Sequence, residues 1–133
     1  MTRLMAIALA GALLAAPAEA RTFYCKLTPD GTNDPIPPDM QIELDEASSQ
    51  VTVWDGLIKA QVGKPLQGKL RSVNAKRYLF GWSIPGVKND SGQYTAGITF
   101  SLNIIRASGA AQVTAKPQGY ANSWRGSGTC TEQ

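Results

Sequence analysis

The sequence has carboxylates at a spacing suited to acid–base chemistry, but it contains no histidine. Ser-His-Asp catalysts, Cys-His catalysts and histidine-liganded metal sites are therefore excluded. Glu43 and Asp45 share one face of an expected strand, and Asp55 follows nearby. Residues i and i+2 on a strand lie about 6.5–7 Å apart, and glycoside hydrolysis needs two carboxylates about 5–5.5 or 6.5–9.5 Å apart. Alternating acids on a solvent-facing strand give the same spacing, so we expect no catalytic activity from this pattern.

Two cysteines, Cys25 and Cys130, lie near the two ends of the chain. Two are too few for an all-cysteine zinc site, and they allow only one intramolecular pairing. Redox-active pairs are usually close in sequence, as in C-x-x-C, whereas these two are far apart. We therefore expect a structural disulfide that joins the first strand to the last.

The first twenty residues have the pattern of a secretory signal peptide. Arg3 precedes an uncharged apolar run over residues 4–16, and residues 18–20 form an A-x-A cleavage site. The alternative is a membrane anchor or a buried helix, but the run is shorter than the about 20 residues that span a bilayer. Arg21 follows the cleavage site where a lipoprotein would have cysteine, so no stable membrane anchor is expected. The sequence predicts a bacterial-type signal peptide over 1–20, one mature domain over 21–133, and a periplasmic or secreted protein.

Short stretches of alternating apolar and polar residues, separated by Gly, Pro, Asn and Asp, fill the mature chain. No run of apolar residues at i, i+3 and i+4 occurs beyond the signal, so no helix is predicted. The pattern predicts an all-β fold, a single antiparallel barrel or sandwich of about 8–10 short strands. Strands are expected at 22–28, 41–45, 50–55, 57–62, 66–73, 76–84, 94–106, 111–116, 119–125 and 127–131.

Three local features refine this prediction. The polar residues 46–49 are expected to form the turn of a hairpin, and the Pro/Gly/Asp-rich segment 30–39 is expected to be an irregular loop. Gly81 interrupts a strong strand and indicates a bulge or a bend. The loop at 30–34 is rich in oxygen ligands but lacks the spacing of an EF-hand, so a turn is expected there and no metal site.

Charge is segregated along the chain. All seven charged residues between Leu27 and Ile58 are acidic, and all seven from Lys59 to Lys88 are basic. Acidic strands that pair with basic strands would neutralise these charges across the sheet. The other interpretation is a molecule with a basic face, which would attract anionic partners. The net charge of +3 is too small to indicate nucleic acid.

Several residues are candidates for a recognition surface. Trp54 faces away from Val51 and Val53, and Trp124 lies in a polar, glycine-rich segment. Trp and Arg are the residue types that anchor interfaces, whereas Trp82 belongs to an alternating run that is expected in the core. The candidate interaction residues are Trp54, Lys59, Arg71, Arg77, Ser91, Gly92, Trp124 and Arg125.

In outline the chain resembles the small exported β-barrel inhibitors of c-type lysozyme. The resemblance rests on Tyr24-Cys25, the segment Ser91-Gly92-Gln93-Tyr94, Phe100 and Cys130. In that family the Ser-Gly loop and a downstream lysine enter the lysozyme cleft. The resemblance implies the same role for Ser91, while the lysine position has at best Arg106, and the mature chain is longer than is usual in the family.

The sequence thus predicts an exported binding or interaction protein without catalytic activity or cofactor. The expected partner is an anionic protein, a glycan or a small molecule, with no nucleic acid. One alternative is a periplasmic inhibitor of a hydrolase such as lysozyme. Another is a ligand-binding β-barrel resembling lipocalins in outline, in which Trp82 and Phe100 line a cavity. A sizeable apolar pocket would favour the ligand barrel, and a packed interior would favour surface recognition.

Overall fold

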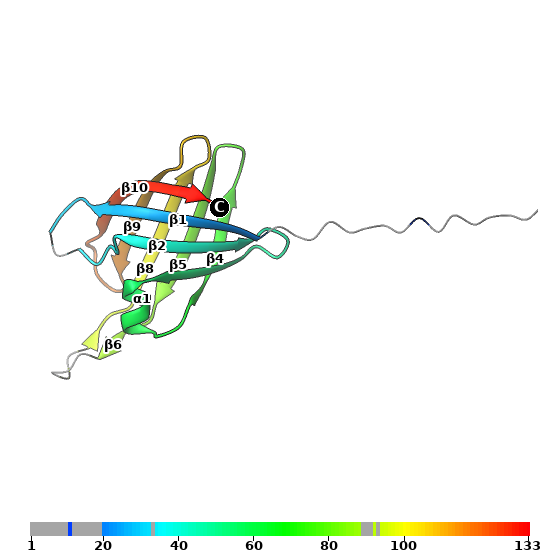
Figure 1. Cartoon of the computed structure of the whole chain (residues 1–133). Helices are drawn as coiled ribbons and strands as arrows, with labels where there is room; N and C mark the ends of the chain where they lie inside the picture. Colours follow the sequence, from blue (N-terminus) through cyan, green and yellow to red (C-terminus); the bar gives the residue numbers. More distant parts are fainter. Residues whose placement is uncertain (1–10, 12–19, 33, 89–91, 93) are drawn as a thin grey trace, which may run out of the picture.

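Antiparallel strands close into an eight-stranded barrel in the computed structural model, which describes residues 11, 20–32, 34–88, 92 and 94–133 (Figure 1). Around the barrel the order is β1-β10-β9-β8-β5-β4-β3-β2, which is an up-and-down barrel. The predicted all-β fold is confirmed in its barrel form. The strands are β1 (Ala20–Pro29), β2 (Asp39–Asp45), β3 (Gln50–Asp55), β4 (Leu66–Val73), β5 (Arg77–Ile84), β6 (Val87–Lys88), β7 (Tyr94–Thr95), β8 (Ile98–Ile105), β9 (Ala110–Pro117) and β10 (Trp124–Glu132), and the helix is α1 (Gly56–Gln61).

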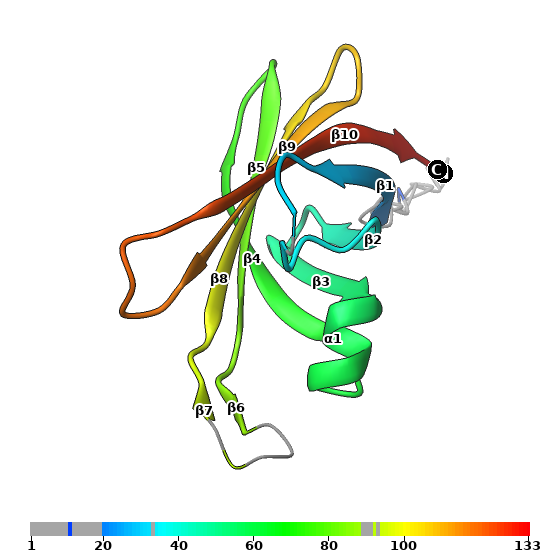
Figure 2. The same ribbon diagram turned by 90° about the vertical axis from the view of Figure 1, so that its left-hand side faces the viewer.

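The two ends of the barrel differ in what covers them. One end, here the turn end, carries the β2–β3, β4–β5 and β8–β9 turns together with the C-terminus. The opposite end, the helix end, carries α1 and the separate two-stranded sheet β6-β7. In Figure 2 the β6–β7 hairpin extends away from the barrel beside α1.

Inward-facing aromatic side chains fill the interior. Phe80 and Phe100 are fully buried, and Trp82 is 3% exposed, as its alternating run predicts. Trp82 stacks on Phe100 with 5.5 Å between ring centroids and an interplanar angle of 3°. Phe23 packs on Tyr78 and Phe80 at centroid distances of 5.2 and 5.9 Å. These paired rings occupy the space in which a small-ligand barrel would hold its ligand.

The predicted disulfide between Cys25 and Cys130 is present and joins β1 to β10. The two residues lie directly opposite each other in the antiparallel register, with 4.0 Å between their Cα atoms. Gly128 allows β1 and β10 to approach closely here, because a Cβ at this position would collide with the carbonyl oxygen of Lys26. The bridge therefore covalently reinforces the pairing that closes the barrel.

The prediction of a strand at 57–62 is wrong, because these residues belong to α1 and to the turn that follows it. Asp55 caps this helix: its side-chain Oδ1 accepts a hydrogen bond from the Ile58 N–H at 2.7 Å. Ile58 is the buried residue of the helix, and Leu57 and Val62 pack against the core. The short apolar sequence gave no helical periodicity, so the cap alone marks where the helix begins.

Two other predicted strands have different bounds. The segment 94–106 is divided, since Tyr94–Thr95 pair with β6 and the long barrel strand begins at Ile98. The segment 119–125 is mostly a turn, with Gly119 at a positive φ of 84°, and β10 begins at Trp124 and continues through the predicted strand 127–131.

The predicted hairpin is confirmed, because β2 and β3 pair across the turn at 46–49. The described residues of 30–38 lie outside regular strands, and Asp39 begins β2. The irregularity expected at Gly81 lies on the neighbouring strand, where the register shifts between Leu70 and Ser72. The Arg71 side chain crosses the outer face of Gly81, and a Cβ there would collide with its Nε.

Loss of the disulfide is expected to weaken the fold without changing it. The bridge spans 105 residues, and removing such a bridge from a small secreted domain costs about 2–5 kcal/mol. Urea unfolding of Cys25→Ser/Cys130→Ser should show this loss, while the far-ultraviolet spectrum before unfolding stays that of the native protein. The native protein with reductant should match the double variant, and equal stability of the oxidised and reduced forms would contradict the prediction.

Candidate binding groove

A hollow of substantial size lies on the outside of the barrel, where β10, β1, β2 and β3 run side by side. Thr131, Tyr24, Gln41 and Trp54 are direct register partners on these four strands. Because partners opposite each other point to the same face of a sheet, these four side chains form a row across the strands. This set is named the aromatic row. Tyr24 is 41% exposed, and Trp54 is half-buried.

A second row of outward-facing residues runs parallel to the aromatic row on the side of the helix end. It consists of Thr129, Lys26 and Asp39, which are also register partners. The inward-facing residues Cys25 and Met40 lie between the two rows and contribute the floor. The hollow, here the groove, has a volume of about 530 Å³ and is lined by Tyr24, Cys25, Lys26, Asp39, Met40, Gln41, Trp54, Asp55, Gly56, Lys59, Thr129 and Thr131.

The groove continues past the aromatic row into a smaller hollow of about 190 Å³. The two hollows share Gln41 and Trp54, and the second adds Glu43, Thr52 and Pro65. The indole of Trp54 therefore borders open space on two sides. An extended ligand could lie across it, rather than only a compact one in a single pocket.

Charges of both signs line the groove. Lys26 and Asp39 are register partners on β1 and β2, and Lys59 reaches the groove from α1. Asp55 is 4% exposed and lies where β3 meets α1. With two lysines and two aspartates, the formal charges of the lining balance, so the groove is polar without a strong field of either sign.

Burial raises the pKa of the Asp55 carboxyl above its ordinary value of 3.8, and the backbone N–H groups of Ile58 and Leu57 oppose this shift. One oxygen, Oδ1, caps α1, while Oδ2 is buried and has no hydrogen-bond partner among the described residues. Asp55 follows Val51 and Val53 on the inward face of β3, opposite to Trp54. The carboxyl is thus committed to the helix cap and the core rather than to the aromatic row.

The three carboxylates considered for acid–base chemistry do not come together. Glu43 and Asp45 are exposed on the outer face of β2, whereas Asp55 points inward from β3. Among the described residues, no group of three or more His, Cys, Asp or Glu side chains is placed to hold a metal ion. In the loop at 30–34 the Gly31 N–H donates to Asp34 Oδ2 at 2.9 Å, a contact typical of a turn.

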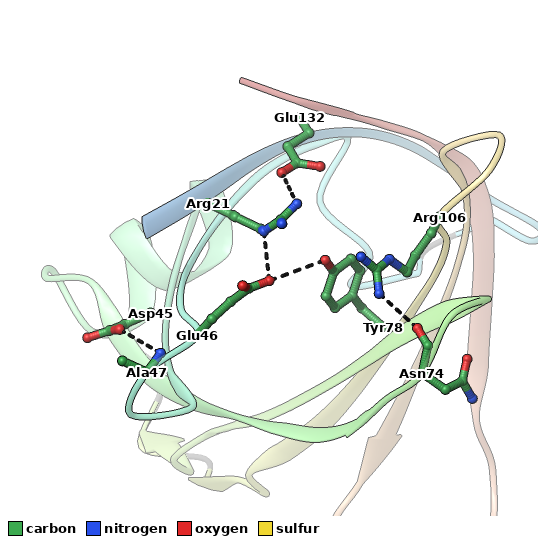
Figure 3. A network of polar contacts seen from close by, with 8 residues as sticks. All are labelled: Arg21, Asp45, Glu46, Ala47, Asn74, Tyr78, Arg106 and Glu132. Carbon is green, nitrogen blue, oxygen red and sulfur yellow. Dashed lines mark hydrogen bonds and ion pairs between the residues drawn. The ribbon is translucent and has the colours of Figure 1, made fainter. Parts of the chain in front are cut away.

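A polar network occupies the turn end of the barrel (Figure 3). Arg21 Nε lies 2.7 Å from Glu46 Oε1, and Arg21 Nη1 donates to Glu132 Oε1 at 2.7 Å, which raises the already high pKa of the guanidinium. The Tyr78 hydroxyl donates to Glu46 at 3.5 Å, and Arg106 lies 4.6 Å from the centre of the Tyr78 ring. The network connects the first strand, the last strand and two turns, and it therefore stabilises the turn end of the barrel.

Arg106 therefore lies at the opposite end of β8 from the β6–β7 hairpin that carries Ser91 and Gly92. Ser91 is outside the described residues, and Gly92 is exposed with a positive φ of 82°.

The remaining predicted interaction residues are spread over other parts of the barrel. Arg71 and Arg77 are exposed on β4 and β5. Trp124 is half-buried and packs against the core, while Arg125 is exposed beside a hollow of about 420 Å³. Of the eight residues predicted from the sequence, the structure brings together Trp54 and Lys59 in the groove.

The acidic and basic segments do not neutralise each other as paired strands. The acidic β2 and the basic β4 are separated by β3, whose outward residues Gln50, Thr52 and Trp54 carry no charge. Within the part of the chain that the structure describes, both ion pairs are made by Arg21. The acidic β2 and the basic β4 are thus kept apart by β3, whereas Asp39 and Lys59, one from each segment, line the same groove beside Trp54.

Sequence reasoning missed most of the groove. Tyr24, Gln41 and Lys26 are outward-facing by alternation, which the sequence signals because Tyr24 stands beside the inward Cys25. The missing information was which strands adjoin, since only the register of β10, β1, β2 and β3 brings these side chains into rows.

No protein-family model, curated protein or solved structure matches this chain. The described part of the chain contains no helix with the length and apolarity needed to cross a membrane. The disulfide indicates an oxidising, non-cytoplasmic location.

Replacement of Asp55 by asparagine is expected to stabilise the protein at pH 7. The folded-state pKa lies above the ordinary 3.8, so the folded protein binds this proton more tightly than the unfolded chain. The cost of burying the charge therefore does not reduce the stability below about pH 3.8. It grows as the pH rises from there through the folded-state pKa, and it is constant above that pKa. Asparagine keeps an oxygen for the cap and has no charge to bury.

Thermal unfolding between pH 3 and 8 checks this prediction. Asp55→Asn should unfold at a higher temperature than the native protein at pH 7, and the two curves should approach each other at low pH. Asp55→Ala is the control for the cap itself and should lose about 1 kcal/mol even at low pH. A lower unfolding temperature for Asp55→Asn at pH 7 would contradict it.

Proposed function

We propose that this chain is an exported, non-catalytic binding protein that holds its partner in the groove, with Trp54 and Tyr24 as the anchoring side chains. The observation that carries the proposal is the aromatic row, which places two large aromatic side chains along an open hollow of about 530 Å³. Tryptophan and tyrosine supply large contact area with few rotatable bonds, and they are enriched among the few residues that carry most of the binding energy of an interface. The lining also supplies amide, hydroxyl and charged groups that would orient a partner.

The packed interior supports recognition at the surface. The stacked pair of Trp82 and Phe100 fills the space that an internal ligand would need. The opposite orientation of Asp55 and Trp54 on β3 supports binding rather than catalysis, because the buried carboxyl does not share a face with the anchoring indole.

Export is part of the proposal. The sequence pattern over residues 1–20 is that of a signal peptide, and the disulfide suits an oxidising compartment. Cleavage after Ala20 would keep Arg21, and with it both ion pairs of the turn end, in the mature protein.

Truncation of Trp54 is expected to weaken capture of the partner. The oxidised protein is immobilised, exposed to periplasmic and secreted extract, and the retained molecules are identified by mass spectrometry. Trp54→Ala should weaken retention by about 30-fold, the equivalent of the roughly 2 kcal/mol typical of a central aromatic anchor. The matched control is Tyr120→Ala, which removes a 67% exposed aromatic outside the groove and should retain the same molecules as the native protein.

Because Trp54 also packs against the core, its variant must first be shown to unfold at close to the native temperature. Tyr24→Ala removes the other anchor from a more exposed position and provides a second test. Retention that is unchanged in both folded variants would overturn the proposal.

A second candidate function is inhibition of a c-type lysozyme through the β6–β7 hairpin. The observation that favours it is the position of β6 and β7, which form their own sheet and extend away from the barrel at the helix end (Figure 2). Since Arg106 lies at the other end, the hairpin would have to act without it.

Under this candidate, Ser91→Asp should raise the inhibition constant for a c-type lysozyme at least about tenfold, because it places a charge at the centre of the inserted loop. Ser72→Asp makes the same exchange at an exposed position on β4 and should have no effect. A constant that Ser91→Asp leaves unchanged would rule the candidate out.

A further inference from the structure

We infer that the partner held in the groove is a neutral, extended β-1,4-linked glycan that lies across the strands, with alternate sugar rings on Tyr24 and Trp54. This inference rests on the proposed function, because it assigns a chemical class to the occupant of the same groove. It is argued from the spacing of the aromatic row, from the hydrogen-bonding groups beside it and from the balance of charge around it.

The spacing of the two aromatic residues fits every second ring of such a chain. Tyr24 and Trp54 lie on β1 and β3 and share one register partner, Gln41 on β2. Their Cα atoms are therefore two strand spacings apart, which is about 10 Å. In an extended β-1,4-linked chain, consecutive rings are turned over relative to each other, and two rings span about this length. Rings one and three thus present the same face to the sheet, one over each aromatic side chain.

The middle ring lies over Gln41, where the polar groups suit sugar hydroxyls. Gln41 Nε2 donates to Glu43 Oε1 at 3.2 Å, which fixes the amide and leaves its carbonyl oxygen and a second N–H for a ligand. Asp39 and Thr52 lie on either side of this position in the linings of the two hollows. Sugar hydroxyls both donate and accept hydrogen bonds, so a mixed row of amide, carboxylate and hydroxyl groups can satisfy them.

The charges favour a neutral chain over a charged one. Lys26 and Lys59 are balanced by Asp39 in the groove and by Glu43 in the adjoining hollow. A polyanion crossing the row would meet the exposed Glu43 on β2, and a polycation would meet the two lysines. A neutral polar ligand is the class that gains contacts from this lining without repulsion from either sign of charge.

Two other occupants fit the groove less well. An extended peptide usually gains its affinity by pairing with a free strand edge, but all four strands under the groove are paired on both sides in the closed barrel. A lipid chain would cover Lys26, Asp39 and Gln41 without giving them hydrogen-bond partners, which is costly.

The length dependence of binding provides the sharpest test. Calorimetric titrations with neutral β-1,4-linked glucose and N-acetylglucosamine oligomers of two, three and six rings are compared. Three rings are needed to reach both aromatic side chains, so the trimer should bind at least tenfold more tightly than the dimer, and the hexamer at least as tightly as the trimer. In Tyr24→Ala the trimer should lose this advantage, whereas Tyr120→Ala should behave as the native protein.

Further ligands separate the chemical classes. A β-1,4-linked uronate hexamer, a de-N-acetylated glucosamine hexamer with free amines, and an uncharged extended peptide should each bind at least tenfold more weakly than the neutral hexamer. Tighter binding of the peptide or of a charged oligomer would overturn the glycan assignment. So would equal affinity for dimer and trimer, or no binding of any neutral oligomer.

The outcome of this experiment can be distinguished from the outcome of the experiment that tests the proposed function. If no neutral oligomer binds but Trp54→Ala still weakens capture from extract, the groove remains the binding site and the glycan assignment is wrong. If neither the binding of oligomers nor the capture of molecules from extract depends on Trp54 and Tyr24, both inferences are wrong.

Discussion

Closure of β1 against β10 is the constraint on which the rest of the structure depends. Seven residue pairs, including Cys25 with Cys130, hold the first strand to the last, and Gly128 gives the backbone of Lys26 the room to come close. An open sheet would leave two unpaired edges and expose the inward faces of both strands. The same closure creates the groove, because Thr129 and Thr131 on β10 reach Tyr24 and Lys26 only across this junction.

Closure also fixes what each side chain can do, because it divides every strand into an inward and an outward set. The inward set is almost wholly apolar, with Asp55 as the buried charged residue at the end of β3. Its position offsets part of the burial cost, because the carboxyl replaces the missing hydrogen-bond partner at the start of α1. The helix in turn brings Lys59 to the groove, so an unfavourable inward carboxylate helps to build one wall of an outward-facing site.

Alternation was enough to predict the fold class and the face of the sheet to which single residues point. Within one strand it separates the inward Val51 and Val53 from the outward Trp54. Within another it separates the inward Phe80 and Trp82 from Gly81. It could not predict adjacency across long connections. The short turn at 46–49 fixes the register of β2 and β3 and so places Gln41 opposite Trp54. The long loop at 30–38 does not fix the register of β1 and β2, so the sequence could not place Tyr24 opposite Gln41. The helix α1 was missed for a different reason: six residues are too few to show a period of 3.6, and the cap by Asp55 depends on its burial.

The segregation of charge gains its meaning from the order of the strands. Had β2 and β4 been neighbours, their opposite charges would have paired and the outer face would have been neutral and closed. With β3 between them, the uncharged Gln50, Thr52 and Trp54 form a strip bordered by acids on one side and bases on the other. Trp54 itself has Gln41 as its partner on β2 and lies beyond the paired part of β4, and the groove beside it is lined by Lys59 and Asp39 together. A ligand across Trp54 would therefore meet charges of both signs at close range, and under the proposed assignment a neutral, polar molecule makes its contacts there without repulsion from either sign.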